Sequence, residues 1–432
     1  MATVQQVVHA VSSAIAQQKG EALAEALQQL DLSNAALIAQ LTAGRIDVRA
    51  LCSSVLDRPY DEMLAEQLDS LVAIHGNDHV KAYSHQESAC TKFHSVFEKE
   101  KDTSWSLPVM HRLDLLLRMA AIRADATLKK SAAGGGDITD TREKAVRVLQ
   151  KSFTICISDR AKVEVRDADG TLLHVINNPH FSKKWGTLHV INNLFKIYFQ
   201  LNKLTLCKNL IKAVDGPGFP KVLYGQEHES GRSFPIEQLV TYHYFVGRLN
   251  LLNSQFPIAQ EHLLFSFENC PAASYQNKRL ILRYLVPVRL VLGKFASPAL
   301  LTKYDLPQFV PLCHAVHRGD LRLFERQLDD YQHLFIRHGS YLLVERAKTI
   351  AYRNFFRRVY SLHPEGTTKL DVAMLKRCLD ATGVNLDHDE IECVLANLIY
   401  KGYIKGYLSH QHGKLVVGKT NAFPALGQVN AS

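Results

Sequence analysis

The chain has 432 residues, of which 47% are hydrophobic and 22% are charged. This balance supplies enough apolar material for a large core and excludes a chain that is disordered throughout. Only 14 residues are proline, and leucine, alanine, glutamine, lysine and glutamate recur in the long stretches that helices tolerate. The longest apolar run, residues 280–293, contains two arginines and a proline, so we expect no membrane insertion.

The net charge of +9 is unevenly distributed along the chain. Residues 1–180 carry 20 basic and 23 acidic side chains, residues 181–360 carry 24 and 12, and residues 361–432 carry 7 and 7. The whole excess lies in the middle of the chain. This distribution indicates an anionic partner for the central region, either nucleic acid or an acidic polypeptide, although a basic surface without a specific partner is the alternative.

The first 20 residues have no basic segment that leads into an apolar block, so we expect no secretory signal and an intracellular protein. The eight cysteines are never closer than 15 residues. This spacing excludes a local zinc ribbon or a redox pair, and we interpret them as reduced thiols that are mostly buried.

Residues 1–128 predict an N-terminal helical region, because apolar side chains recur at helical spacing between short polar breaks. Residues 129–140 include three consecutive glycines and show no apolar period, which predicts a flexible linker or loop.

Residues 141–360 predict a helical-repeat solenoid, interrupted near residues 163–180 by an inserted hairpin or loop. The segment 170–178 nearly duplicates 186–193, and we treat the first copy as the insertion. Successive helices are expected at residues 236–252, 257–270, 276–293 and 297–306, each ended by proline, glycine or asparagine. Helix pairs that cannot bury their apolar faces alone are typical of an α-solenoid.

Residues 361–420 predict a winged helix, with helices at 370–379 and 390–401 followed by a hairpin around residues 411–413. Residues 421–432 show no period and predict a loose tail. The predicted fold is mainly α, an α-solenoid of helix pairs that ends in a C-terminal winged helix, which is the plan of a PCI domain.

Several motifs resemble the PCI domain-containing protein 2 (Thp-type) family, over roughly residues 140 to 426. They are the segments 182–186 (SKKWG), 193–199 (NLFKIYF), 241–248 (TYHYFVGR), 277–279 (NKR), 395–400 (LANLIY) and 406–417 (GYLSHQHGKLVV).

The resemblance implies a non-catalytic scaffold subunit of a nuclear complex that couples transcription to mRNA export through the nuclear pore. The implied partners are a GANP-type scaffold protein, a small acidic Sem/DSS-type subunit, and RNA and DNA contacted through phosphates. The implied location is the nucleus at the nuclear pore, with the cytoplasm as a second location.

A basic surface is expected where the last solenoid helix, taken as residues 340–360, meets the winged helix. Lysine and arginine that neutralise phosphates give affinity without sequence preference, whereas solvated helix faces are the alternative. The nucleic-acid-binding residues proposed are Arg353, Arg357, Arg358, Lys376, Arg377, Lys401, Lys405, Lys414 and Lys419.

The charged and aromatic members of the family-like motifs are expected to contact partner proteins. These partner-binding residues are Lys183, Lys184, Trp185, Lys278, Arg279, Arg283, Tyr400, Tyr407 and His410. His410 and His412 could share one face of an extended segment, but no third ligand has suitable spacing, so we expect no metal.

No phosphate-binding loop, dinucleotide fingerprint, zinc-protease or nucleophile-elbow motif occurs, so we expect neither an enzyme nor a cofactor. Two alternatives remain open: a PCI subunit of another assembly, such as a signalosome or proteasome lid, and a DNA-binding winged-helix regulator. The acidic segment 387–392 disfavours the second alternative, because a DNA reader places basic or amide side chains there.

Overall fold

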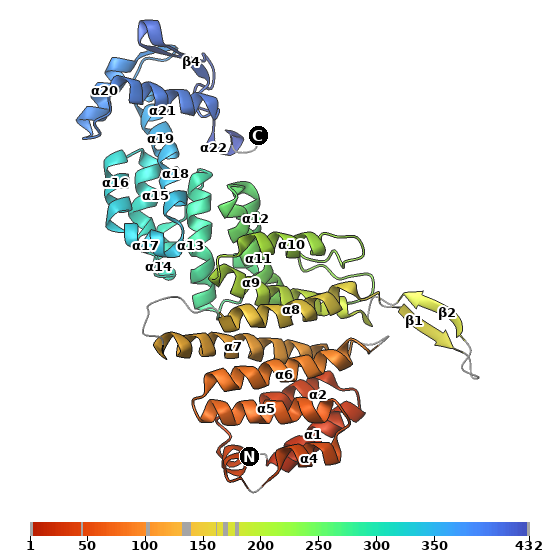
Figure 1. Ribbon diagram of the computed structural model, residues 1–432. Helices are drawn as coiled ribbons and strands as arrows, with labels where there is room; N and C mark the ends of the chain where they lie inside the picture. The colour runs from red at the N-terminus through yellow and green to blue at the C-terminus, as the bar shows by residue number, and fades with distance from the viewer. Residues whose placement is uncertain are drawn as a thin grey trace. The chain divides into compact units, whose positions relative to one another are not determined.

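A computed structural model describes residues 3–44, 46–100, 104–131, 140–160, 162–166, 172–177 and 181–429. The predicted fold is confirmed: the chain is mainly α-helical, and its helix pairs form an α-solenoid that ends in a winged helix (Figure 1). Two compact units are present, Met1–Tyr242 and His243–Ser432, and the division falls within one helix. Among the described residues, no helix has the length and apolarity that a membrane crossing requires.

Most helices of the first unit pack on a neighbour in the chain, and the second helix also packs on the seventh. Their bounds are α1 (Val4–Ala16), α2 (Gly20–Gln28), α3 (Ala35–Thr42), α4 (Val48–Val55), α5 (Tyr60–His75), α6 (His79–Phe97), α7 (Leu107–Ser131), α8 (Asp140–Ser158), α9 (Thr187–Gln200), α10 (Leu204–Val214) and α11 (Ile236–Leu252), the last of which contains the division. From α5 to α9 each helix contacts the next, and Figure 1 shows α5, α6 and α7 as successive layers. Each helix therefore buries apolar side chains against both neighbours, as a solenoid requires.

The connection between α7 and α8 differs from the linker predicted at residues 129–140. Residues 129–131 belong to α7 and Asp140 begins α8, while 132–139 lie outside the described residues. The buried carboxylate of Asp125 on α7 accepts from the backbone nitrogen of Thr141 at 3.0 Å and from Nε of Arg142 at 2.6 Å. A side chain of α7 thus satisfies the free donors at the start of α8, which fixes where α8 begins.

The inserted segment contains a two-stranded antiparallel hairpin, as its alternating pattern predicts. Strand β1 (Lys162–Arg166) pairs with β2 (Leu172–Asn177), and the register shifts between Val165 and Arg166. Residues 167–171 and 178–180 of the expected excursion lie outside the described part. A short 3₁₀ turn, η2 (Lys183–Gly186), then leads into α9.

Helices of the second unit are mostly shorter. Their bounds are α12 (Phe256–Asn269), α13 (Tyr275–Val291), α14 (Pro298–Lys303), α15 (Phe309–Arg318), α16 (Leu321–Asp330), α17 (Gln332–His338), α18 (Tyr341–Arg346) and α19 (Lys348–Ser361). The single helix expected over residues 340–360 is wrong, because the chain breaks at Ala347 into α18 and α19. Six of the eight cysteines are buried, Cys378 is half-buried and Cys393 is exposed.

The winged helix contains one more strand than the sequence predicts. It consists of β3 (Lys369–Asp371), α20 (Val372–Ala381), α21 (His388–Tyr400), β4 (Gly406–Ser409), η3 (His410–His412) and β5 (Lys414–Val417), with sheet order β3-β5-β4. Leu370, expected to open a helix, is buried in β3 opposite Leu415, so the helix starts two residues later. The Asp387 side chain accepts from Glu390 N at 2.7 Å and the Glu390 side chain from Asp387 N at 2.8 Å, a capping box that begins α21.

The loose tail expected at residues 421–432 is wrong as far as Val429. Ala422 and Phe423 are buried, and a helical turn, α22 (Leu426–Val429), follows. Leu426 lies against Gly293, beyond the end of α13, and Val429 lies against Gly402 of the winged helix. We call residues 422–429 the C-terminal strap, because they contact both the solenoid and the winged helix within the second unit.

The end of α15 approaches the backbone of α19 at a glycine, where there is no room for a side chain. Gly319 has a φ of +70°, and a Cβ atom there would collide with the backbone of Phe355. Gly319→Ala should therefore lower the free energy of unfolding by more than the roughly 1–2 kcal/mol that a left-handed conformation alone costs. Gly339→Ala is the control, since Gly339 has a φ of +67° but open space around it. Equal losses of melting temperature in the two variants would contradict this packing.

Candidate nucleic-acid and partner interfaces

Arg353 on α19 is buried, contrary to its predicted place on a basic surface. Its exposed fraction is 1%, and Nη2 donates to the backbone oxygens of Phe423 at 3.2 Å and Pro424 at 2.5 Å. Nη1 donates to the side-chain oxygen of Asn354 at 2.9 Å. Burial, with a smaller contribution from Arg357, lowers its pKa to about 10, which leaves the side chain charged at neutral pH. Because its donors point into the protein, Arg353 is not available to phosphate.

Arg357 and Arg358 are exposed on the same helix, as expected. Nη1 of Arg358 donates to the backbone oxygen of Arg318 at the end of α15, at 3.0 Å, which brings two arginines together. Arg322 on α16 is also exposed, and its side chain lies beside Gly383 in the turn after α20. Sequence reasoning missed Arg318 and Arg322, because only the packing of α15 and α16 on α19 brings them near the winged helix.

Lys376 and Lys414 already have anionic partners in the winged helix. Lys376 donates to Asp380 at 3.2 Å and to the backbone oxygen of Leu386 at 2.8 Å, and Lys414 pairs with Asp371 at 2.6 Å. The hydrogen bond from Lys414 is the main reason that the pKa of Asp371 lies below its ordinary value. These lysines contribute less net positive charge than the sequence suggests, whereas Arg377 on α20 is exposed.

Three predicted lysines gather where α21 meets the sheet. Lys401 caps the end of α21, and Lys405 exchanges backbone hydrogen bonds with Ala422 and Gly418, next to Lys419. All three lysines are exposed, and no hydrogen bond or ion pair engages their side chains in the described part of the chain. We call them the lysine cluster.

Two tyrosines from the partner-binding prediction lie beside the lysine cluster in the sequence and are also exposed. Tyr400 ends α21 and is 89% exposed, and Tyr407 on β4 is 62% exposed. Exposed lysines interleaved with exposed aromatic rings can contact phosphates and stack on bases. The structure thus divides the predicted basic surface into the lysine cluster, the exposed arginines Arg357, Arg358 and Arg377, and two lysines, Lys376 and Lys414, that are paired with aspartates.

His410 pairs with a carboxylate of α21. Its Nδ1 lies 2.6 Å from Oε2 of Glu392, and Nε2 of His388 lies 3.4 Å from Oε1 of the same residue. Glu392 is buried while His410 is largely exposed. The acidic residues at the start of α21 therefore stabilise the fold. Asp387 and Glu390 cap the helix, and Glu392 pairs with His410 between β4 and β5.

The motif at residues 183–185 belongs to the core of the first unit, which corrects its predicted role in partner binding. Lys183 is buried, its Nζ donates to the backbone oxygens of Phe97 and Glu100, and burial lowers its pKa. Lys184 donates to the backbone oxygen of Gly218 at 2.7 Å. Trp185 is buried, with its ring centroid 4.9 Å from that of Phe234. Such contacts position α9 and leave little of the motif for a partner.

Two basic residues at the start of α13 are held by α12 and by the turn after α14. Lys278 donates to the backbone oxygen of Phe267 at 2.8 Å, and Arg279 pairs with Asp305 at 2.7 Å. Arg283, one turn further along, is half-buried. Lys278 and Arg279 are thus engaged within the protein, and Arg283 is the one of the three predicted residues that these contacts do not involve.

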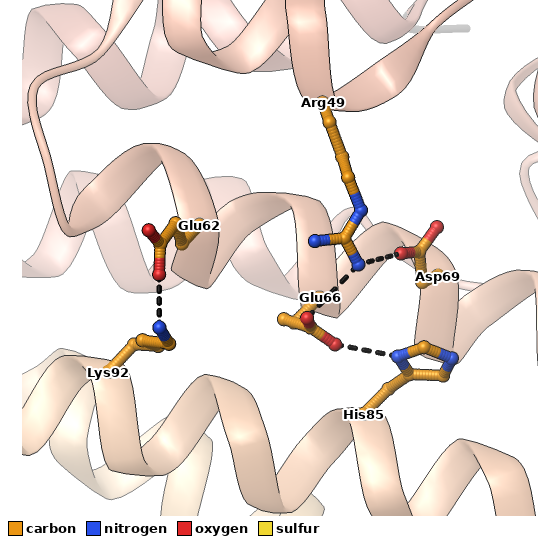
Figure 2. Close-up of polar contacts among 6 residues, drawn as sticks. All are labelled: Arg49, Glu62, Glu66, Asp69, His85 and Lys92. Atoms are coloured by element: carbon orange, nitrogen blue, oxygen red, sulfur yellow. Dashed lines mark hydrogen bonds and ion pairs between the residues drawn. The ribbon is translucent and has the colours of Figure 1, made fainter.

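A cluster in the first unit offers the ligand types that metals prefer. Glu66, Asp69 and His85 each present an atom within 4.8 Å of the others. Figure 2 shows that Arg49 bridges the two carboxylates: its Nη2 donates to Glu66 at 3.1 Å and to Asp69 at 2.9 Å, while Nδ1 of His85 lies 2.6 Å from Glu66. A metal ion would have to displace this guanidinium. We therefore assign the cluster to the attachment of α4 and α6 to α5.

The fold and the surface define a class of protein. Residues 328–419, which span the end of the solenoid and the winged helix, match the PCI domain. A helical solenoid that ends in this domain is the form of a PCI scaffold subunit, which serves the assembly of protein complexes.

Comparison with known proteins narrows the class to a family. The chain is 41% identical over 379 residues to "PCI domain-containing protein 2" of Xenopus laevis, with 88% of each chain covered. It is also 41% identical over 380 residues to the Danio rerio protein of that name, again with 88% of each covered. "Protein CSN12 homolog" of Mycosarcoma maydis is 30% identical over 424 residues, covering 88% of this chain and 87% of that protein. The chain belongs to the PCI domain-containing protein 2 family.

The pair of His410 and Glu392 makes the winged helix sensitive to pH. Hydrogen bonding to Glu392 and its negative charge raise the pKa of His410 above 6.5. The pair should stabilise the fold fully below the unfolded pKa and lose this contribution as pH rises through the higher folded pKa. Glu392→Gln should lower the pKa of His410, measured by NMR titration of the imidazole. If the pKa of His410 were the same in both proteins, the pairing would be refuted.

Proposed function

We propose that this PCI scaffold subunit works in a nuclear complex that couples transcription to mRNA export through the nuclear pore. It binds a GANP-type scaffold and a small acidic Sem/DSS-type subunit, and it contacts RNA or DNA through the phosphate backbone. The protein acts without catalysis of its own. The family resemblance supports the export role, and the excess of basic residues between positions 181 and 360 supports the acidic subunit.

One observation carries the nucleic-acid part of the proposal: the lysine cluster is exposed and has no anionic partner in the described residues, with Tyr400 and Tyr407 exposed nearby in the sequence. Lysines already paired within a protein release few counterions on binding nucleic acid, whereas free lysines release them fully. Rings that stack on any base add affinity with little sequence preference. Both properties suit a protein that must handle unrelated transcripts.

A PCI subunit of another assembly, such as a signalosome or proteasome lid, is the alternative. The lysine cluster favours export, because a purely architectural subunit has no need of free phosphate-binding side chains. The proteins that accompany the tagged chain when it is purified from nuclei distinguish the two. An independent DNA-binding regulator is disfavoured, since the exposed carboxylates of Asp389 and Glu390 open the helix that would enter a groove.

The salt dependence of RNA binding tests the lysine cluster. Each phosphate contact on a single strand contributes about 0.7 to the slope of log affinity against log salt. The triple variant Lys401→Ala/Lys405→Ala/Lys419→Ala should therefore lower the slope by about 2, equally for two unrelated RNAs of the same length. Fluorescence anisotropy of labelled RNA with the full chain, at several salt concentrations, measures this.

A matched control removes three lysines that are ion-paired in the first unit. In Lys144→Ala/Lys151→Ala/Lys203→Ala the slope should hardly change, because Asp140, Glu98 and Glu143 already neutralise these side chains. Equal slopes for wild type and the cluster variant would place the RNA site elsewhere. A strong preference for one RNA would mean that bases are read directly.

A further inference from the structure

Helices α7 and α9 of the first unit contact each other directly, and basic side chains lie along the contact. The imidazole rings of His111 on α7 and His189 on α9 stack with their centroids 4.2 Å apart. Seven residues further along α7, Nε of Arg118 donates to Oδ1 of Asn193 on α9 at 2.8 Å. Lys196 therefore lies close to Arg118, because it follows Asn193 by three residues on the same face of α9. We call Arg118 and Lys196 the α7–α9 cation pair.

The α7–α9 cation pair is half-buried and has no anionic partner in the described part of the chain. Burial, followed by the charge of Arg118, lowers the pKa of Lys196, and burial also lowers the pKa of Arg118. Two like charges that are partly removed from water destabilise a fold unless an anion offsets them. The pair is therefore a feature that the packing of the first unit alone does not explain.

The carboxylates on the neighbouring helices are engaged elsewhere. Helices α9 and α10 contain neither aspartate nor glutamate. On α7, Asp114 and Asp125 are buried and accept hydrogen bonds from α8. On α8, which packs on both α7 and α9, Asp140 and Glu143 are paired with other lysines. The negative charge that would balance the α7–α9 cation pair is thus not supplied by α7, α8, α9 or α10.

A metal ion does not suit this contact, although imidazoles are common metal ligands. Nε2 of His111 and Nε2 of His189 are buried and have no hydrogen-bond partner among the described residues. Burial is the main reason that the pKa of His189 falls to about 4, so its ring is neutral at neutral pH. The nearby cations repel a metal ion, however, and the described residues place no third ligand beside the two rings. The same positive charges attract an anion.

A phosphate group is the anion that this arrangement suits best. The donors of a guanidinium match the oxygens of a phosphate, and a phosphate that carries close to two negative charges balances both cations, whereas one carboxylate balances only one. Asn193 holds Nε of Arg118, and it donates in turn to the backbone oxygen of His189 at 3.2 Å. The guanidinium is therefore oriented before any ligand arrives, which lowers the entropy cost of binding.

We propose that the α7–α9 cation pair binds the phosphate group of a small phosphorylated molecule. Two cations at one helix contact match one phosphate group, whereas a nucleic-acid strand needs a longer track of basic side chains. The pair belongs to the first unit and the lysine cluster to the second, so this inference does not depend on the RNA proposal. A bound phosphate would link α7 to α9, and it would stabilise the first unit by mass action.

Calorimetric titration of the full chain with inorganic pyrophosphate, at an ionic strength held constant with sodium chloride, tests this inference. Wild type should bind pyrophosphate saturably, and Arg118→Gln/Lys196→Met should bind it at least tenfold more weakly. Pyrophosphate should also raise the melting temperature of wild type and leave that of the double variant unchanged. Lys196→Met alone breaks no hydrogen bond or ion pair of the described residues, and it should weaken binding in the same direction.

Arg123→Gln/Lys208→Met is the matched control, because it removes the same two charges from exposed positions on α7 and α10. It should bind pyrophosphate as wild type does. The absence of saturable binding to wild type, or an equal loss of affinity in the two double variants, would overturn the inference. Displacement of pyrophosphate by unrelated single-stranded RNAs would also overturn it, since the occupant would then be nucleic acid.

Discussion

The buried guanidinium of Arg353 is the interaction on which the C-terminal half of the protein depends. A charge removed from water is costly unless its donors are satisfied, and here backbone oxygens of Phe423 and Pro424 accept from it in place of a carboxylate. No ion pair compensates Arg353 among the described residues, so the carbonyl dipoles of the C-terminal strap are its principal counter-charge, with the Asn354 side chain. The strap therefore cannot leave without exposing a cavity and an unsatisfied cation. The strap also connects the solenoid to the winged helix, because its Leu426 packs against Gly293 and its Val429 packs against Gly402.

This connection fixes the positions of surface residues within the second unit. The lysine cluster lies where α21 meets the sheet, and Lys405 is itself bonded through its backbone to Ala422 of the strap. An apolar groove lies between the loop after α11 and the pair α17 and α18. A scaffold subunit needs surfaces that keep their positions when one partner binds, and residues that are linked through packed elements meet that need.

The sequence predicted the helix pairs well and the roles of individual charged residues poorly. Apolar periodicity located α11 to its end residues, because periodicity reports which face is buried. It could not show that Arg353 is buried while Arg357 is exposed, since both occur in a charged helical stretch and only the strap, 70 residues away, distinguishes them. The six residues Leu-His-Val-Ile-Asn-Asn occur twice, at 173–178 and 188–193: five of the first copy lie in β2, whereas the second copy is part of α9. Local sequence is the same in both, so tertiary packing decides the conformation.

Hydrogen exchange of the strap tests this account most directly. Arg353→Met keeps much of the apolar bulk of the side chain and removes the donors to Phe423 and Pro424, while Arg357→Met removes an exposed charge one helical turn away. The account predicts that backbone amides of residues 422–429 exchange at least tenfold faster in Arg353→Met than in wild type, with those of β4 and β5 following, and that Arg357→Met leaves them unchanged. Equal protection of the strap in all three proteins would contradict it, because the winged helix would then be held to the solenoid by other contacts.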